Sequence, residues 1–270
     1  MSQKLLGVIG VSAILLAAPL GVASAADMGV PYKAPPPPPP AVSWTGCYVD
    51  AGYGYGLWDQ RQYQETFPGL APTSATVDSG GKGWLGRFGG GCDYQLGGMG
   101  LSNWVVGAFA DYDWMNIHGQ MSPGDTIFVG NEKESGAWYV GGRIGYLVTP
   151  SLMTYFDGGY TQTHYSSVAL GALPVPTPVG FVGETLPANT YHGWFIGGGT
   201  EYALNFGWLP IHGLFWRNEY RYASYDAVDL PLVPNPGGIA GIGMHSEKDV
   251  QTITSSLVWR FNWGGPIARY

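Results

Sequence analysis

Polar and apolar side chains alternate along eight stretches of the chain, each about a dozen residues long. Within residues 214–225, for example, Arg217, Glu219 and Arg221 occupy odd positions, whereas Trp216 and Tyr220 occupy even ones. Successive side chains of a β-strand point to opposite faces, so each stretch predicts a strand with one charged and one apolar face. The predicted strands are residues 47–58, 83–94, 104–116, 137–148, 153–165, 191–204, 214–225 and 250–261.

The charged residues of these predicted strands always lie opposite the large apolar residues. They are Asp50, Arg87, Asp93, Asp111, Asp113, Arg143, Asp157, Glu201, Arg217, Glu219, Arg221 and Arg260. The opposite positions carry residues such as Val49, Val106 and Ile144. A half-buried soluble sheet also alternates, so a further observation is needed to decide which face is buried.

The tryptophans supply that observation, because they lie near strand ends. If the strands run up and down in turn, Trp58, Trp84, Trp114, Trp138 and Trp194 collect at one rim, and Trp44, Trp104, Trp208, Trp216, Trp259 and Trp263 at the other. An indole at a bilayer interface keeps its ring in lipid and its N–H at the headgroups. The pattern therefore predicts an all-β, eight-stranded antiparallel up-and-down transmembrane β-barrel with two aromatic girdles. Tryptophans that fill a soluble core would show no such banding.

The start of the chain has the features of an export signal. Lys4 precedes an apolar stretch at residues 5–22, and Ala23-Ser24-Ala25 matches a cleavage site of small residues. Six consecutive prolines at residues 35–40 predict a semi-rigid linker. We therefore expect a signal peptide at residues 1–25, a proline-rich periplasmic linker at 26–43 and an outer-membrane barrel at 44–270.

The connections between the predicted strands alternate in length. Residues 59–82, 118–136, 166–190 and 226–249 are long connections, whereas 95–103, 149–152 and 205–213 are short. Outer-membrane barrels have short periplasmic turns and longer extracellular loops. This pattern places both chain ends in the periplasm, and an even strand number lets the sheet close without an exposed edge.

The chain resembles the small eight-stranded outer-membrane barrels of alphaproteobacteria, the porin-family or RopB-type surface proteins, within the group similar to the OmpA transmembrane domain. The resemblance rests on the export signal, on Lys33-Ala34-Pro35, on Trp44-Thr45-Gly46-Cys47-Tyr48-Val49 and on Leu257-Val258-Trp259-Arg260-Phe261-Asn262-Trp263. It implies a carboxy-terminal signal for the barrel assembly machinery. Phe261, Trp263 and Tyr270 are all candidates for that signal, because Gly264-Gly265-Pro266 interrupts the last strand pattern.

The predicted lumen contains five arginines and seven acidic residues. Eight strands enclose a space that side chains can fill, and unpaired buried charge is costly. We therefore expect arginine–carboxylate pairs to plug the lumen, giving an integral outer-membrane protein with a structural and surface-interacting role. The alternative is a narrow porin for passive diffusion of small hydrophilic solutes.

Two other function classes have weaker support in the sequence. His164-Tyr165-Ser166 has the His-x-Ser spacing of lipid A deacylases, but no orienting carboxylate is evident. A soluble lipocalin-like carrier would have an apolar interior and a charged exterior, the reverse of this pattern. We expect no catalytic activity and no cofactor. The spacing of His118, His192, His212 and His245 predicts no metal site.

Charge and cysteine content restrict the partners and the compartment. The formal net charge is −7 with no basic patch, which argues against nucleic acid. Acidic residues outnumber basic ones in the long connections, so divalent cations bridging them to lipopolysaccharide are a hypothesis. We expect outer-membrane lipid, lipopolysaccharide and the assembly machinery as partners. Cys47 and Cys92 would lie opposite each other at one rim, and we expect a disulfide in an oxidising compartment.

Overall fold

The computed structural model describes residues 42–97, 100–124, 128–172, 183–204, 213–235, 237 and 240–261. The predicted signal peptide and nearly all of the predicted linker lie outside this range. The described residues form eleven strands. Their bounds are β1 Gly46–Thr66, β2 Val77–Gln95, β3 Trp104–Met121, β4 Phe128–Thr149, β5 Leu152–Tyr165, β6 Val168–Ala172, β7 Glu184–Leu186, β8 Asn189–Ala203, β9 Leu214–Pro231, β10 Val233–Pro234 and β11 Ile242–Phe261.

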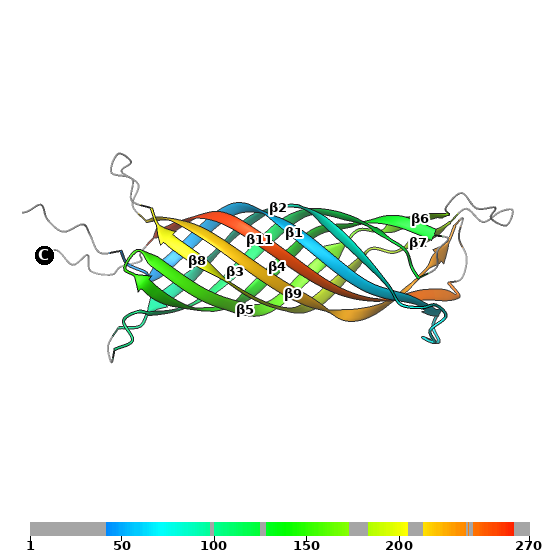
Figure 1. The fold of residues 1–270 in the computed structure, drawn as a ribbon, viewed down its shortest axis with the longest axis horizontal. Coiled ribbons are helices and arrows are strands. Elements are labelled where there is room, and N and C mark those ends of the chain that lie inside the picture. The colour runs from blue at the N-terminus through cyan, green and yellow to red at the C-terminus, as the bar shows by residue number, and fades with distance from the viewer. Residues whose placement is uncertain are drawn as a thin grey trace, which may run out of the picture. The chain divides into compact units, whose positions relative to one another are not determined.

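Eight of these strands close into a ring. Each of β1, β2, β3, β4, β5, β8, β9 and β11 pairs antiparallel with the next, and β11 pairs back with β1 from Cys47↔Phe261 to Thr66↔Ile242. The strands are tilted relative to the long axis of the barrel (Figure 1). The predicted eight-stranded antiparallel up-and-down barrel is thus confirmed.

Most ring strands are longer than predicted, because the ring ladder continues into three of the four predicted long loops, at 59–82, 118–136 and 226–249. β1 runs to Thr66 and β11 begins at Ile242, so the predicted loops at 59–82 and 226–249 are largely strand. In β4 a β-bulge opposite β5, between Glu134 and Gly136, reverses the alternation. Glu134 and Ala137 both face inward as a result, which hides the strand pattern in the sequence.

Three short strands extend the sheet at the end of the barrel where the longest hairpins lie (Figure 1). β6 pairs with the start of β4, and β7 pairs with both β6 and β10. Buried apolar side chains fill this end of the barrel. They are Met121, Phe128, Val168, Leu170, Leu186, Leu230, Leu232 and Met244.

The outer surface carries an apolar band between two rings of exposed tryptophans. Trp84, Trp114, Trp138 and Trp194 form one ring, and Trp104, Trp216 and Trp259 form the other. The stretch from Trp104 to Trp114 on β3 has the length of about 9–11 residues that a tilted strand needs to cross hydrocarbon. We call the part between the rings the membrane band, and the part beyond Trp84 and Trp114 the extension. The predicted girdle residues Trp208 and Trp263 lie outside the described residues.

Trp58 and Trp44 were expected in the girdles, and this prediction is wrong. Trp58 is 1% exposed inside the barrel, whereas Trp84 is 64% exposed on its surface. Trp44 is also fully buried, and its indole N–H donates to the Pro150 carbonyl oxygen at 3.1 Å. Both residues share the parity of Asp50, so side-chain alternation, and not nearness to a strand end, decides their direction.

The part of the chain that the structure describes contains no helix long and apolar enough to span a bilayer.

Candidate functional site

The twelve charged residues that the sequence assigns to the lumen all lie inside the membrane-band part of the barrel, and none is more than 6% exposed. Their ion pairs form two layers, each connected within itself, and we call the two layers together the lumen network. The lower layer is the one nearer the ring of Trp104, and the upper layer is the one nearer the ring of Trp84. The lower layer contains Asp50, Asp93, Arg143, Glu201, Arg217 and Arg260. The upper layer contains Arg87, Asp111, Asp113, Asp157, Glu219 and Arg221.

Glu201 on β8 is at the centre of the lower layer, because its carboxylate contacts three guanidinium groups. The N–O distances are 2.6 Å to Arg260, 3.0 Å to Arg217 and 3.3 Å to Arg143. Asp93 bridges two of these arginines, with a contact of 2.6 Å to Arg260 and a second hydrogen bond from Arg143. The layer holds three arginines and three carboxylates, so its formal charge balances.

The upper layer holds two arginines and four carboxylates. Arg87 donates two parallel hydrogen bonds of 2.7 Å to Asp113, the fork geometry that makes arginine–carboxylate pairs strong. Arg221 contacts Asp111 at 2.6 Å and Glu219 at 2.6 Å. Glu219 also pairs with Arg87, so it joins the two arginines. The carboxylates therefore share the available guanidinium groups.

Aromatic rings packed against the arginines fill the space around the lumen network, and we did not predict them as lumen residues. Arg143, Arg217 and Arg260 lie 4.6, 4.7 and 5.0 Å from the centre of the Tyr48 ring, and Arg221 lies 5.1 Å from the Tyr139 ring. Such cation–π contacts stabilise desolvated guanidinium groups. The inward aromatic residues could have been found by parity, since each shares the parity of the charged residues on its own strand. They are Tyr48, Phe109, Tyr139, Tyr155, Phe195 and Phe215.

Glycines provide the room for the buried carboxylates. A Cβ added at Gly107 would lie 2.0 Å from Asp93 Oδ1, and one added at Gly89 would lie 2.0 Å from Asp111 Oδ1. Gly86 faces outward, and a Cβ there would meet nothing within 4 Å. The lumen network therefore requires glycine at these two inward positions, because the side chain of any larger residue would displace its carboxylates.

Beyond the membrane band, the interior holds one buried lysine enclosed by aromatic rings. Lys248 lies 4.0 Å from the Tyr165 ring centre, pairs with Glu132 at 2.8 Å and donates to Gln60. Trp58 and Tyr191 complete the enclosure.

Ionisation within this enclosure is perturbed by burial. Burial lowers the pKa of Lys248, although Glu132 acts in the opposite direction. Burial also raises the pKa of Glu134 to about 7, against the hydrogen bond that Thr163 donates to its carboxylate. Glu134 lies on β4 on the loop side of Trp138, outside the membrane band. Close to neutral pH, the extension therefore holds a carboxyl group near its midpoint of ionisation.

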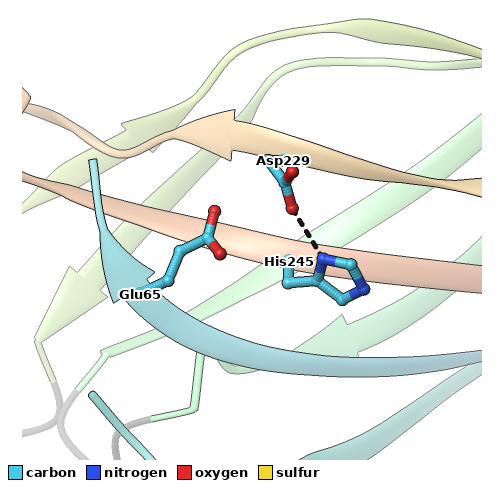
Figure 2. A group of neighbouring side chains, drawn as sticks. All are labelled: Glu65, Asp229 and His245. Carbon is cyan, nitrogen blue, oxygen red and sulfur yellow. Dashed lines mark hydrogen bonds and ion pairs between the residues drawn. The ribbon is translucent and has the colours of Figure 1, made fainter. Parts of the chain in front are cut away.

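At the end of the extension that is farther from the membrane band, three side chains from three strands converge (Figure 2). Glu65 comes from β1, Asp229 from β9 and His245 from β11. Their potential ligand atoms all lie within 4.8 Å of one another, and His245 Nδ1 is 2.6 Å from Asp229 Oδ1. Burial and the neighbouring Asp229 carboxylate raise the pKa of Glu65. No spacing along the chain predicted this group, because only the strand register brings its members together.

The two cysteines are joined in a disulfide. Cys47 on β1 and Cys92 on β2 are directly opposed in the ladder, as are Trp58 and Gly81 further along the same strand pair. The bond lies near the end of the membrane band that is opposite the extension. It links two strands that are already hydrogen-bonded neighbours.

The His-x-Ser candidate lies on the outside of the extension. His164 is exposed, and its Nδ1 is 3.1 Å from the hydroxyl of Thr190. Tyr165 between the two residues points inward and is buried. The polar partner that the structure gives His164 is therefore a hydroxyl group, whereas an acid–base pair of the hydrolase type uses a carboxylate to orient the imidazole.

The closed ring, the apolar membrane band and the charged interior define a transmembrane β-barrel. The family model of the outer membrane protein beta-barrel domain matches residues 13–261, and the chain belongs to this family of outer-membrane proteins. The 31 kDa outer-membrane immunogenic proteins of Brucella melitensis biotype 1 and Brucella suis biovar 1 are each 28% identical to this chain over 226 residues. The match covers 81% of this chain and 84% of each relative.

Solved outer-membrane structures also align with the chain. The outer membrane protein OprG from Pseudomonas aeruginosa aligns at 11% identity with a TM-score of 0.47, covering 81% of this chain and 97% of OprG. Ail, the attachment invasion locus protein of Yersinia pestis, aligns at 8% identity with a TM-score of 0.34, covering 80% of this chain and 99% of Ail.

Proposed function

We propose that this outer-membrane protein is a non-conducting, non-catalytic barrel with a structural and surface-interacting role, and that the lumen network closes its interior. The observation that carries this proposal is the pairing of all twelve charged lumen residues in a space where none exceeds 6% exposure. Ions that enter such a lumen would have to replace multiple guanidinium–carboxylate contacts.

The apolar cluster at the tip of the extension supports the same proposal. Leu170, Leu232 and Met244 are almost fully buried there, so a solute would also have to pass an apolar barrier. The name of the Brucella relatives, an outer-membrane immunogenic protein, is consistent with a surface-exposed extension in this chain as well.

Single-channel conductance in planar bilayers tests the closed lumen. We expect no steady conductance from the unmodified protein. Arg217→Ala should raise ion passage, because it removes the partner of Asp50 and one of the three partners of Glu201. Arg61→Ala is the matched control, since Arg61 lies exposed at the outer rim and pairs only with Glu247 among the described residues. A large, steady conductance in the unmodified protein would contradict the proposal.

A narrow porin is the second candidate, because several buried atoms of the lumen network have no hydrogen-bond partner. They include Asp50 Oδ2, Asp111 Oδ1, Asp157 Oδ1 and Arg221 Nη1. Water molecules in the lumen would satisfy such atoms. The conductance measurement distinguishes the two candidates, since a porin conducts without any substitution.

We further propose that residues 1–25 direct export and are removed, that both chain ends lie in the periplasm and that the extension faces outward, where it contacts lipopolysaccharide. The apolar band and its tryptophan rings support the membrane placement, but they are compatible with either orientation. Labelling intact cells with a membrane-impermeant maleimide tests the orientation. A cysteine replacing exposed His118 in the extension should react, whereas protection in intact cells and reaction only after lysis would reverse the orientation.

A further inference from the structure

The group formed by Glu65, Asp229 and His245 has the composition of a metal site. It offers two carboxylate oxygens and one imidazole nitrogen, which come from three different ring strands and point toward one another (Figure 2). Two carboxylates with one imidazole carry a formal charge that a divalent cation neutralises. Aspartate, glutamate and histidine are all ordinary ligands of zinc.

Glu65 provides a second, independent indication of a ligand. The residue is 1% exposed, and its Oε1 is buried without a hydrogen-bond partner. An ionised carboxylate in such a position is costly unless it is paired or coordinates a metal. The neighbouring Asp229 carboxylate adds repulsion, which the His245 imidazole opposes. The buried carboxylate thus directs an oxygen without a hydrogen-bond partner toward the other two side chains.

His245 is held in an orientation suited to coordination through Nδ1. Its ring stacks on Tyr63 with the centroids 4.7 Å apart, and Nδ1 points at Asp229. The other ring nitrogen, Nε2, lies 3.6 Å from the Glu247 carboxylate, which in turn pairs with Arg61 at 3.1 Å. Histidine ligands of metals commonly direct their free N–H toward a carboxylate of this kind, which fixes the tautomer.

We propose that Glu65, Asp229 and His245 form a binding site for a divalent transition-metal ion of the zinc class at the outer rim of the barrel. The imidazole favours zinc and similar ions over calcium and magnesium, which prefer oxygen ligands alone. Asp229 and His245 are partly exposed, so water reaches the site and can occupy the remaining coordination position. A bound ion would connect the outer ends of β1, β9 and β11. This proposal does not depend on whether the lumen conducts.

Isothermal titration calorimetry on the untagged protein, purified from outer membranes in detergent at neutral pH, tests the site. We expect one zinc ion per chain in the unmodified protein, with much weaker binding of calcium and magnesium. Glu65→Gln and His245→Ala should each weaken zinc binding by roughly 100-fold or more, because replacing even the outer partners of metal ligands costs 10–100-fold. His118→Ala is the matched control and should bind zinc normally, since His118 is an exposed histidine elsewhere in the extension.

Cobalt provides a second readout, because its visible absorption reports the coordination geometry. The unmodified protein should give ligand-field bands that His245→Ala lacks. The heat-dependent shift of gel mobility checks the folding of each variant. The His245 side chain is 20% exposed, so its replacement should leave the barrel folded even if Glu65→Gln does not. The proposal is overturned if the unmodified protein binds no stoichiometric zinc, or if folded His245→Ala binds zinc as tightly as the unmodified protein.

Discussion

The membrane band and the tip of the extension share most of their strands, yet different kinds of side chain dominate their interiors. In the membrane band, Ile253 faces outward and is 62% exposed, while charged residues fill the interior. At the tip of the extension, Leu170 is 2% exposed within an apolar cluster. The difference shows that strand alternation alone does not define the inside of a barrel. The solvent outside the barrel determines which face is apolar, and it changes from lipid to water along each strand.

Lys248 and its aromatic neighbours lie in the extension, between the lumen network and the apolar tip. The lumen network pairs arginines and carboxylates in forks, whereas the lysine has one ion-pair partner at 2.8 Å and three rings around it. Toward the tip, the interior thus passes from the lumen network through the aromatic enclosure of Lys248 to an apolar cluster. Glu65 and Glu184 are also buried at that end. Substitutions in each part should therefore lower the free energy of unfolding for different physical reasons.

The largest loss in the free energy of unfolding is expected for Glu201→Gln in the membrane band. The substitution leaves three buried guanidinium groups around a neutral amide, and breaking a buried ion pair in this way costs about 3–5 kcal/mol. Urea unfolding from lipid vesicles measures the loss. Glu247→Gln, at an exposed pair on the outer rim, should change the free energy of unfolding by no more than about 1 kcal/mol. Equal losses in the two variants would show that the buried ion pairs around Glu201 contribute no more stability than an exposed pair.

The second-largest loss of stability is expected for a substitution in the apolar tip of the extension. Leu232→Ala should destabilise the extension by about 2–4 kcal/mol, because it leaves a cavity in a closed apolar cluster. Leu257→Ala on the lipid-facing surface should cost less, since lipid chains can fill the space that the side chain leaves. Protease resistance of the extension and urea unfolding measure the two losses. A larger loss for Leu257→Ala would show that the tip is not a packed core.

A smaller effect is expected for Gly107→Ala, which places a methyl group against the Asp93 carboxylate. Overpacking of this kind costs about 1–3 kcal/mol. Gly86→Ala is the matched control on β2, because its added Cβ meets no atom within 4 Å. If the two variants unfold at the same urea concentration, the inward glycines are not needed to accommodate the lumen network.

The smallest change in stability is expected from the ionisation of Glu134 as the pH changes. Burial raises the pKa of Glu134 to about 7, so the folded protein binds more protons than the unfolded chain between the ordinary glutamate pKa and neutrality. Stability of the extension should therefore be highest below that window and fall as the pH rises through about 7. Glu134→Gln should remove this dependence. Thermal melting followed by circular dichroism from pH 5 to 8 tests both statements, and an unmodified protein that gains stability over this range would contradict them.

The sequence predicted the barrel and the lumen network because both follow from local alternation. Each of the twelve charged residues of the lumen network was identified by its parity on one strand, without knowledge of its partners. The buried residues Glu132, Glu134 and Lys248 of the extension were missed, because they fall in predicted loops. Trp58 was misplaced because nearness to a strand end was given more weight than its shared parity with Asp50. In the extension, the bulge beside Glu134 reverses the alternation, so strand residues resemble loop residues.

The rim group of Glu65, Asp229 and His245 could not be predicted for a different reason. Its members are far apart in the sequence, and their convergence depends on the register of β1 against β11 and of β11 against β9. His245 and Asp229 are directly paired across strands, but no spacing rule along the chain reveals this.

Spin-label accessibility at two positions on β3 tests whether the surroundings of the barrel change from lipid to water along this strand. Val106 and His118 lie on the same face of this strand, one in the membrane band and one in the extension. Because both native cysteines are joined in the disulfide, a single cysteine introduced at either position can be labelled selectively. We expect a nitroxide at Val106 to collide preferentially with oxygen dissolved in lipid, and one at His118 to collide preferentially with a water-soluble nickel complex. Equal access of the nickel complex to both positions would contradict this expectation.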